Sequence, residues 1–278
     1  MKNTEGKFEG AKRLSIFYQS WLPENPKAIV QVVHGFAEHS GRYLNVVNEL
    51  VPLDYGIYAD DHRGHGRSEG TRNYVDSFDQ YIEDEKTLYD IIKEKHPNLP
   101  IFLLGHSMGS LIVIYVIKKY EDLYKGLILS GTGTSAGDKI SGFLKTMAKV
   151  MGKIAPKLKI SPGLEANMLS HDPEVVKAYQ EDPNVYAEKI TARLGYEMLN
   201  KFESVLDVID KFKLPLLVQC GSEDALIKGA EEEIKEAFKM DDQTINIYDG
   251  LYHEVYNELE KDRKIVLKDL SNWLEKHV

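Results

Sequence analysis

Cysteine is almost absent from this sequence of 278 residues, with Cys220 as its one example. A single cysteine excludes an internal disulfide framework and any zinc site built from clustered cysteines. The longest apolar run in the middle of the chain, 111–117, is far shorter than the roughly 20 residues that cross a bilayer. The opening residues 1–7 are polar and contain no apolar signal region. These absences predict a cytoplasmic protein.

Positive charge is also in deficit, because 35 lysine and arginine residues stand against 44 aspartate and glutamate residues, a net charge of −9. A net-acidic chain is a poor general binder of nucleic acid, so no nucleic-acid partner is expected. The hydrophobic fraction of 42% and the charged fraction of 28% are typical of a globular protein. The length suits one large domain with room for an insertion, and nothing in it indicates an oligomeric state.

Short apolar runs alternate with helical patterns along the chain. The strand-like runs are 28–33, 57–59, 101–104, 126–129, 214–218 and 244–248. Apolar residues with helical spacing occupy 43–50, 78–95, 110–120 and 261–273. This alternation predicts an α/β fold with a mostly parallel central sheet flanked by helices. Sites in such sheets lie beyond the carboxyl ends of the strands, which is where His34, Asp60, Gly105 and Gly221 stand.

Residues 133–195 break the alternation. They contain no convincing strand, and they include Pro156, Pro162, Pro173 and Pro183. We therefore predict a helical cap over 133–195, inserted after the sixth strand. The α/β core then consists of residues 1–132 and 196–278.

The Gly-His-Ser-Met-Gly sequence at 105–109 is the strongest chemical signal in the chain. It follows the apolar run 101–104 and precedes the helical run 110–120, the strand–turn–helix setting of a G-x-S-x-G nucleophile. Glycine on both sides permits so tight a turn without a clash of Cβ atoms, and Ser107 projects from it. We predict Ser107 as a nucleophile, with a glycine-rich turn and a helix-capping serine as the simpler alternative.

A serine hydroxyl is a weak nucleophile that needs a base, and the chain offers nine histidines. His253 is the leading candidate because it follows the last predicted strand. The order serine, acid, histidine along an α/β-hydrolase chain also favours it. His277 lies at the chain end, where structure frays, and is a poor candidate. The alternative for His253 is an ordinary histidine of a surface loop.

The base needs a carboxylate that fixes its tautomer. The run 214–218 leads into Gly-Ser-Glu-Asp at 221–224, and Asp224 is our choice for the acid. Glu223 is the second choice, and Asp249, which is close to His253 in sequence, is the third. The structural alternative for Asp224 is the N-cap of a helix that begins near residue 227.

Acyl transfer also needs two backbone N–H groups that bind the oxyanion. Met108 follows the nucleophile at a helix N-terminus, where the helix dipole favours negative charge. The loop after 28–33 supplies the second donor, because Gly35 allows a close approach and the Phe36 N–H follows it. We expect His34 to pack at the strand end and to hold this loop rather than to transfer protons.

A metal site is the other chemistry that histidines suggest, because His34, His39, His62 and His65 are close in sequence. Their spacing, including that in the segment 60–66, matches no zinc signature. We therefore expect no metal and no cofactor. A glycine-containing loop braced by hydrogen bonds beside the active site explains the segment better.

With these residues in hand, the chain resembles the monoacylglycerol lipase family of α/β-hydrolases, a serine-aminopeptidase-like group. The resemblance covers nearly the whole chain. Its most specific segments are HGFAEHSGRY at 34–43, DHRGHGRSEG at 61–70, GHSMG at 105–109 and YHEVYNE at 252–258. Together these segments are far more specific than a lone G-x-S-x-G.

The resemblance implies a triad of Ser107, Asp224 and His253, an oxyanion hole formed by Phe36 and Met108, and a lid formed by the insertion. The partner it implies is a monoacylglycerol or a related lipid ester. Hydrolysis would release glycerol and a free fatty acid through an acyl-enzyme intermediate.

The same resemblance implies that Glu38 and Arg42 shape the glycerol end of the pocket. Some members carry another histidine three residues beyond the catalytic one, whereas this chain has Tyr256, so the headgroup preference stays open. A lysophospholipase or a general carboxylesterase would use the same triad. A peptidase is disfavoured because nothing marks an acidic pair for an amine. A receptor that binds a ligand without turnover is the alternative from a different class.

The insertion also has an amphipathic pattern of its own. Its apolar residues with helical spacing are Ile140, Phe143, Leu144, Met147, Val150, Met151 and Ile154. Between Asp138 and Lys159, six lysines minus one aspartate give +5. A basic amphipathic helix suits an anionic lipid surface, so we expect transient contact with membranes or micelles and a peripheral location there. The alternative is a helix that covers the pocket and leaves its lysines in water.

Overall fold

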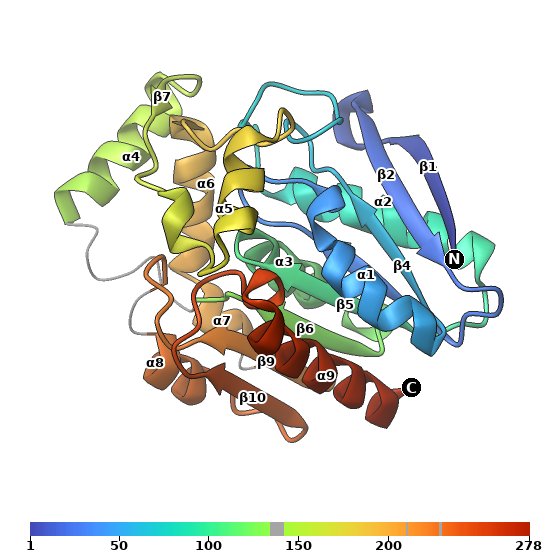
Figure 1. The fold of residues 1–278 in the computed structure, drawn as a ribbon. Helices are drawn as coiled ribbons and strands as arrows, with labels where there is room; N and C mark the ends of the chain where they lie inside the picture. The colour runs from blue at the N-terminus through green and yellow to red at the C-terminus, as the bar shows by residue number, and fades with distance from the viewer. Residues whose placement is uncertain (134–141, 210, 228–229) are drawn as a thin grey trace.

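One sheet with helices on both faces forms the body of the molecule (Figure 1). The computed structural model describes residues 1–133, 142–209, 211–227 and 230–278. This part of the chain forms an eight-stranded sheet in the order β1-β2-β4-β3-β5-β6-β9-β10. Its strands are β1 (Lys2–Glu9), β2 (Ser15–Leu22), β3 (Ala28–Val33), β4 (Tyr55–Asp60), β5 (Ile101–His106), β6 (Gly126–Ser130), β9 (Leu216–Gly221) and β10 (Gln243–Tyr248).

The parallel part of the sheet runs from β4 to β10, and only the pairs β1–β2 and β2–β4 are antiparallel. Its central strands β3, β5 and β6 are buried along their whole length. Burial on both faces explains why these strands are continuous apolar runs rather than alternating ones. The predicted fold class, a mostly parallel sheet flanked by helices, is confirmed.

Two hydrophobic clusters, one on each face of the sheet, pack the sheet against its helices. Within β5, Phe102 packs on the side of α1 (Leu44–Leu50) and α9 (Glu260–His277), and Leu103 packs on the opposite side. That opposite side is covered by α2 (Asp79–Lys95), α3 (Met108–Tyr120), α7 (Val205–Ile209) and α8 (Ala230–Ala237). The short 3-10 helices are Ala11–Arg13, Ser40–Tyr43, Val51–Leu53, Glu121–Leu123, Ala166–Met168 and Val255–Asn257.

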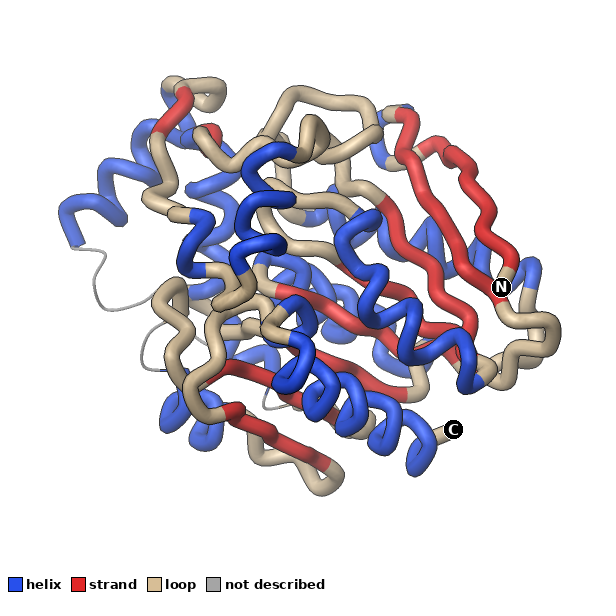
Figure 2. Tube along the Cα trace, in the orientation of Figure 1, coloured by secondary structure: helices blue, strands red, loops and turns tan. Residues whose placement is uncertain are grey.

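The insertion after β6 forms a layer beyond one end of the sheet, as the tube view in Figure 2 shows. Its helices are α4 (Gly142–Ile154), α5 (Pro173–Glu181) and α6 (Ala192–Phe202). A short antiparallel pair, β7 (Lys159–Ile160) and β8 (Ile190–Thr191), corrects our expectation that this segment has no strand. Two residues cannot form an apolar run, so the sequence pattern could not reveal them.

The predicted cap boundary at 195 falls inside α6, which packs on α4 and also contacts α3. Of the predicted amphipathic set, Ile140 and the lysine at 139 lie outside the described residues. The side chains at 143, 144, 145 and 147 lie outside the description as well. Among the described ranges, no helix has the length and apolar character needed to cross a membrane.

Candidate active site

Ser107 occupies the sharp turn between β5 and α3. Its φ of 53° and ψ of −119° put a non-glycine residue in a region that costs about 1–3 kcal/mol. A Cβ at Gly109 would lie 2.0 Å from the Val33 carbonyl oxygen, and a Cβ at Gly35 would lie 3.2 Å from the Ser107 Cβ. Glycine is therefore required where α3 and the loop after β3 approach each other. The turn raises the serine at the carboxyl end of the sheet.

Asp224 and His253 form a buried pair, although 29 positions separate them in the chain. The His253 Nδ1 atom lies 2.7 Å from Asp224 Oδ2. The other carboxylate oxygen, Oδ1, accepts from the backbone N–H groups of Leu226 and Ile227 at 2.9 and 3.1 Å. One carboxylate thus fixes its own turn and orients the histidine ring. The next described helix, α8, begins at Ala230, so the structure does not show Asp224 as the N-cap of a helix that begins near residue 227.

The electrostatics of this pair suit proton transfer. Burial opposes the charged form of His253, but the adjacent Asp224 carboxylate outweighs it and raises the histidine pKa above its ordinary value. Burial likewise disfavours ionised Asp224, yet His253 and the two backbone N–H groups lower the pKa of this carboxyl. Asp224 is therefore a carboxylate at neutral pH, and it stabilises a protonated imidazole.

The competing acids and the competing base lie elsewhere. Glu223 and Asp249 are exposed, and among the described residues the side chain of Asp249 accepts a hydrogen bond only from the Ser222 hydroxyl, at 3.5 Å. His277 is buried rather than frayed, because it bonds to the Trp273 carbonyl at 2.7 Å and to Asp242 at 3.2 Å. Packing of the last turn of α9 on the sheet overrides the general tendency of chain ends to fray.

Ser107 and His253 line the same small pocket, which we call the serine pocket. Phe36, Glu38, Arg42 and Glu254 line it too, and it holds about 260 Å³ of empty space, part of it open to solvent. Within the described residues no hydrogen bond joins the Ser107 hydroxyl to His253, and the ring atom Nε2 is unpartnered. Because Nδ1 is held by Asp224, Nε2 is the nitrogen available to the serine. Such contacts often tighten only when substrate binds.

The two residues predicted to donate to the oxyanion adjoin Ser107: Met108 follows it in the chain, and Phe36 lines the same pocket. Met108 is the first residue of α3, so its N–H belongs to the free N–H groups of a helix N-terminus. Phe36 lies in the loop after β3 and lines the serine pocket. Neither N–H donates a hydrogen bond within the part of the chain that the structure describes.

His34 holds the Phe36 loop, as the sequence analysis expects. Its Nδ1 atom donates to the Gly35 carbonyl at 2.7 Å, and its Nε2 accepts from the His62 N–H at 2.8 Å. The His62 ring stacks on it with 3.8 Å between ring centroids. Burial, together with the neighbouring histidines, lowers the pKa of His34 well below its ordinary value. A neutral ring with both nitrogens engaged in structural hydrogen bonds has no free nitrogen for proton transfer.

One group of side chains in the described chain could hold a metal ion. Potential ligand atoms of Asp60, His62 and Glu85 all lie within 4.8 Å of one another, and all three residues are buried. The spacing rule did not detect this group because Glu85 comes from α2. Burial, followed by the neighbouring Asp60, raises the pKa of Glu85 well above its ordinary value. Burial and Asp60 therefore favour the protonated form of Glu85.

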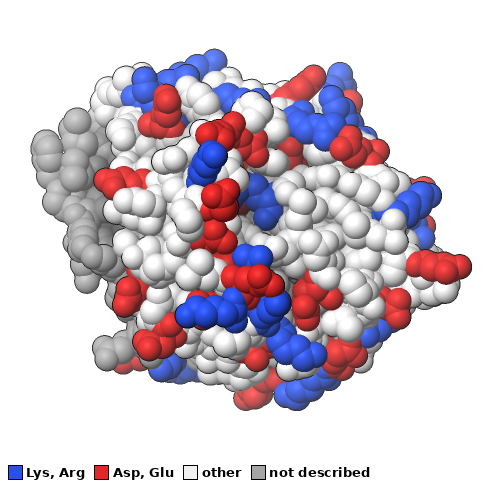
Figure 3. Space-filling view, viewed as in Figure 1, with Lys and Arg blue, Asp and Glu red and all other residues white. Residues whose placement is uncertain are grey.

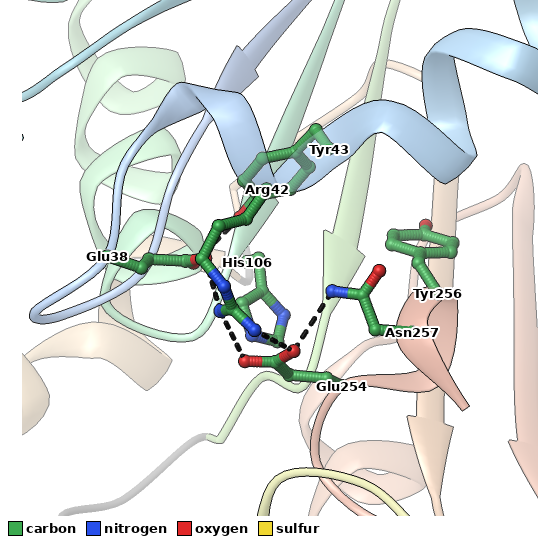
Figure 4. A pocket seen from close by; sticks show the side chains of 7 residues that line it. All are labelled: Glu38, Arg42, Tyr43, His106, Glu254, Tyr256 and Asn257. Carbon is green, nitrogen blue, oxygen red and sulfur yellow. Dashed lines mark hydrogen bonds and ion pairs between the residues drawn. The ribbon is translucent and has the colours of Figure 1, made fainter. Parts of the chain in front are cut away.

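A charged network of Glu38, Arg42 and Glu254 lines the serine pocket and also a second, neighbouring pocket, which Figure 4 shows. Arg42 Nη1 donates to Glu38 Oε2 at 2.9 Å and to Glu254 Oε1 at 2.6 Å. Its Nη2 donates to Glu254 Oε2 at 2.7 Å, which completes a two-bond fork. Glu254 was not singled out in the sequence, although its position next to the predicted base is a signal that could have found it.

Tyr256, three residues beyond His253, turns toward the sheet. Its hydroxyl donates to Gln219 Oε1 at 2.7 Å, and the residue is 4% exposed. Burial raises the pKa of this phenol well above its ordinary value. Tyr256 thus anchors the loop after His253 to β9.

Comparison with known proteins agrees with this geometry. The model of the serine aminopeptidase S33 family matches residues 24–260. A monoacylglycerol lipase of Mycolicibacterium smegmatis is 38% identical over 99% of this chain and 98% of its own. The human monoglyceride lipase is 34% identical over 93% of this chain and 86% of its own.

A solved structure extends the agreement to three dimensions. The monoacylglycerol lipase of Paleococcus ferrophilus aligns over 100% of both chains with a TM-score of 0.82 and 30% identity. The matched length and these identities show that the chain belongs to the serine aminopeptidase S33 family of α/β-hydrolases, alongside the monoacylglycerol lipases.

Proposed function

We propose that this protein is a serine ester hydrolase that cleaves monoacylglycerols to glycerol and free fatty acid. Ser107, deprotonated by His253, attacks the ester carbonyl while the N–H groups of Phe36 and Met108 stabilise the oxyanion. Glycerol leaves with the proton from His253. Water, activated by the same histidine, then releases the fatty acid, and Asp224 stabilises the imidazolium in both steps.

The observation that carries this proposal is the 2.7 Å contact between His253 and Asp224 at the pocket that also contains Ser107. The serine stands on a strained turn, and the N–H groups of Phe36 and Met108, which donate no hydrogen bond within the described residues, belong to the adjoining segments. Full-length relatives named monoacylglycerol and monoglyceride lipase support the choice of substrate. Glu38 and Arg42 line the pocket on the side of Glu254, which supports their predicted place around the glycerol.

The test is hydrolysis of a monoacylglycerol by the wild-type chain and by Ser107→Ala. The variant should lose acyl-enzyme formation and at least about 10³-fold in kcat, since the nucleophile is gone. Turnover of the monoacylglycerol by Ser107→Ala at the wild-type rate would overturn the nucleophile assignment. A panel that adds lysophospholipids and nitrophenyl esters separates this function from a lysophospholipase or a general carboxylesterase.

Labelling by a fluorophosphonate probe distinguishes an enzyme from a receptor of the same fold. An activated serine should react with the probe, and Ser107→Ala should not. Failure of the folded wild-type chain to react would favour a protein that binds its ligand without turnover.

The proposal includes a cap over 133–195 that contacts lipid. Its outer end exposes Val150, Ile154, Leu158 and Ile160, with exposed fractions of 45%, 72%, 45% and 42%. Lys153, Lys157 and Lys159 are exposed between them. In Figure 3, basic side chains gather along the edge over the β7 end of the cap. Exposed apolar area framed by lysines suits an anionic lipid surface, which would bring a cytoplasmic enzyme transiently to membranes.

A further inference from the structure

The Arg42 guanidinium in the serine pocket has its fork already occupied. Recognition of a phosphate group by arginine uses two parallel N–H donors. In this protein Nη1 and Nη2 of Arg42 are both bonded to Glu254, and Nη1 is also bonded to Glu38. The guanidinium lies 4.7 Å from the centroid of the Tyr179 ring, which closes its face. A phosphate that approached the Nη1–Nη2 edge would have to displace Glu254 and leave a buried carboxylate unpaired, which is costly. These contacts use three of the five N–H donors of an arginine, so the charge of the surrounding wall decides whether an anion is accepted at the remaining edge.

The network also makes the wall of the pocket negative. The side chains of Glu38, Arg42 and Glu254 are 5%, 10% and 4% exposed, so solvent screens them little. Burial disfavours ionised Glu254, but Arg42 outweighs it and lowers the glutamate pKa to about 2. Two carboxylates and one guanidinium sum to −1. Among the residues that line the serine pocket in the described chain, no lysine and no second arginine offsets this charge.

The same wall keeps acceptors free for hydroxyl groups. Glu254 Oε1 accepts only from Arg42 among the described residues, and Glu38 Oε2 does the same. A carboxylate oxygen has two lone pairs, so each of these atoms retains room for one more donor. Glycerol hydroxyls are donors, whereas a phosphate ester at neutral pH offers almost none.

We infer that Glu254 is a specificity-determining residue, which holds the Arg42 fork so that the pocket accepts a neutral polyol leaving group and rejects an anionic phosphate headgroup. The inference rests on the proposed function, because it concerns the leaving group of that reaction. Under this inference the headgroup is selected by Glu254, the residue that follows His253, and not by Tyr256.

The test compares kcat/KM for a 1-acylglycerol and for the 1-acylglycerol 3-phosphate with the same short acyl chain, both as monomers. The wild-type chain should prefer the neutral ester by at least about tenfold, since one unit charge within about 6 Å is worth that much or more in a partly buried site. Glu254→Gln should raise the ratio of anionic to neutral substrate by about tenfold. An unchanged ratio in the variant, or equal wild-type rates on both esters, would overturn the inference.

Two references separate headgroup selection from general damage. The rate of each variant on nitrophenyl butyrate, which carries neither headgroup, reports the state of the catalytic groups themselves. Asp249→Asn removes one negative charge from an exposed residue of the same loop and should leave the anionic-to-neutral ratio at its wild-type value. A uniform fall on all three esters in Glu254→Gln, with no change in ratio, would mean a structural role only and would refute the specificity role.

A second measurement needs no variant. Glycerol should inhibit nitrophenyl butyrate hydrolysis by the wild-type chain at least about tenfold more strongly than glycerol 3-phosphate, and added salt should narrow the gap by screening. Equal inhibition would contradict the inference even if Glu254→Gln does not fold. If the wild-type chain cleaves nitrophenyl butyrate but no monoacylglycerol, the proposed function fails instead. If the wild-type chain cleaves monoacylglycerol but does not discriminate between the headgroups, the inference is wrong and the proposed function stands.

Discussion

The strand ends and the insertion after β6, our proposed cap, both contribute residues to the serine pocket, but they differ in which side chains are buried and which are exposed. At the strand ends, charged groups are buried and paired at short distance, as in His253 and Asp224 at 2.7 Å. On the cap, Ile154 is 72% exposed, and Lys153 beside it is exposed to water. The buried His253–Asp224 pair is held in a single geometry. The exposed apolar side chains of the cap, by contrast, can still contact another surface.

The comparison separates chemistry from access. Changes at the strand ends should alter the rate on every ester, because each substrate uses the same proton transfers. Changes on the outer end of the cap should alter only the encounter with substrates held in lipid, since Ile154, Leu158 and Ile160 are not among the described residues that line the serine pocket. A soluble ester and a lipid-borne ester, measured side by side, therefore test the division.

The largest effect is expected from Asp224→Asn. Loss of the carboxylate leaves the His253 tautomer unfixed, so kcat should fall by roughly 10³–10⁴ on nitrophenyl butyrate and on monoacylglycerol alike. Glu223→Gln, which changes an exposed neighbour, is the matched control and should behave as wild type. If Glu223→Gln or Asp249→Asn caused the loss while Asp224→Asn did not, the acid would be misassigned.

The same pair predicts the pH dependence of the reaction. His253 must be neutral to accept the serine proton, so activity should be lost as pH falls through its folded pKa. Asp224 holds that pKa above the ordinary value of 6.5 against the effect of burial. Asp224→Asn should therefore shift the acid limb of kcat/KM to lower pH, in addition to slowing the reaction. An acid limb that does not move would separate His253 from Asp224.

An intermediate effect is expected from the cap. Charge reversal of Lys153, Lys157 and Lys159 to glutamate should weaken binding to phosphatidylglycerol vesicles by at least about tenfold, since each lysine near an anionic surface is worth about 1 kcal/mol. The chain should carry Ser107→Ala to prevent turnover. Lys149 is unsuited to this test because it already pairs with Glu203 at 2.8 Å.

The control for the cap variant replaces three lysines of α9 by glutamate, which changes the net charge by the same amount. Lys261, Lys264 and Lys276 are 80%, 71% and 69% exposed there, and their reversal should leave vesicle binding largely intact. In the active chain, the cap variant should keep its rate on nitrophenyl butyrate. Unchanged vesicle binding by the cap variant would remove lipid docking from the proposed function and leave the esterase chemistry untouched.

The smallest effect is expected from Glu85→Gln, which tests whether a buried carboxyl in the core makes the stability depend on pH. Burial and Asp60 raise the pKa of Glu85 in the folded state. The stability that protonated Glu85 contributes is therefore fully present below the pKa of the unfolded state, and it is lost as the pH rises through the pKa of the folded state. A glutamine cannot ionise, and its amide can donate to Asp60. The variant should gain stability over wild type, on the order of 1 kcal/mol, from pH 5 to pH 8.

Urea unfolding at several pH values measures this difference. Glu83→Gln, an exposed change on the same helix, is the control and should follow the wild-type curve. A Glu85→Gln chain that loses stability as pH rises, in step with wild type, would show that the ionisation of Glu85 does not cause this loss.

Prediction from sequence succeeded where a local pattern carries the signal. The run 101–104 and the pattern 78–95 became β5 and α2, because continuous burial and one-sided burial leave distinct periodicities. The same patterns do not detect β1, whose side chains are mostly exposed, or the two-residue strands β7 and β8.

The site divides in the same way. Ser107 is marked by its glycines, and Asp224 and His253 are marked by the strands before them. Glu85 and Glu254 were overlooked, because each acquires its role from a partner that is distant in the chain.

By itself, the sequence determined the alternation of strands and helices and the local shape of the serine turn, since both follow from neighbouring residues. Tertiary structure alone decided that Asp224 reaches His253, that Glu254 occupies the fork of Arg42, and that His277 is buried. Such contacts depend on how the strands order themselves in the sheet. That order follows from the packing of whole layers, which no short segment encodes.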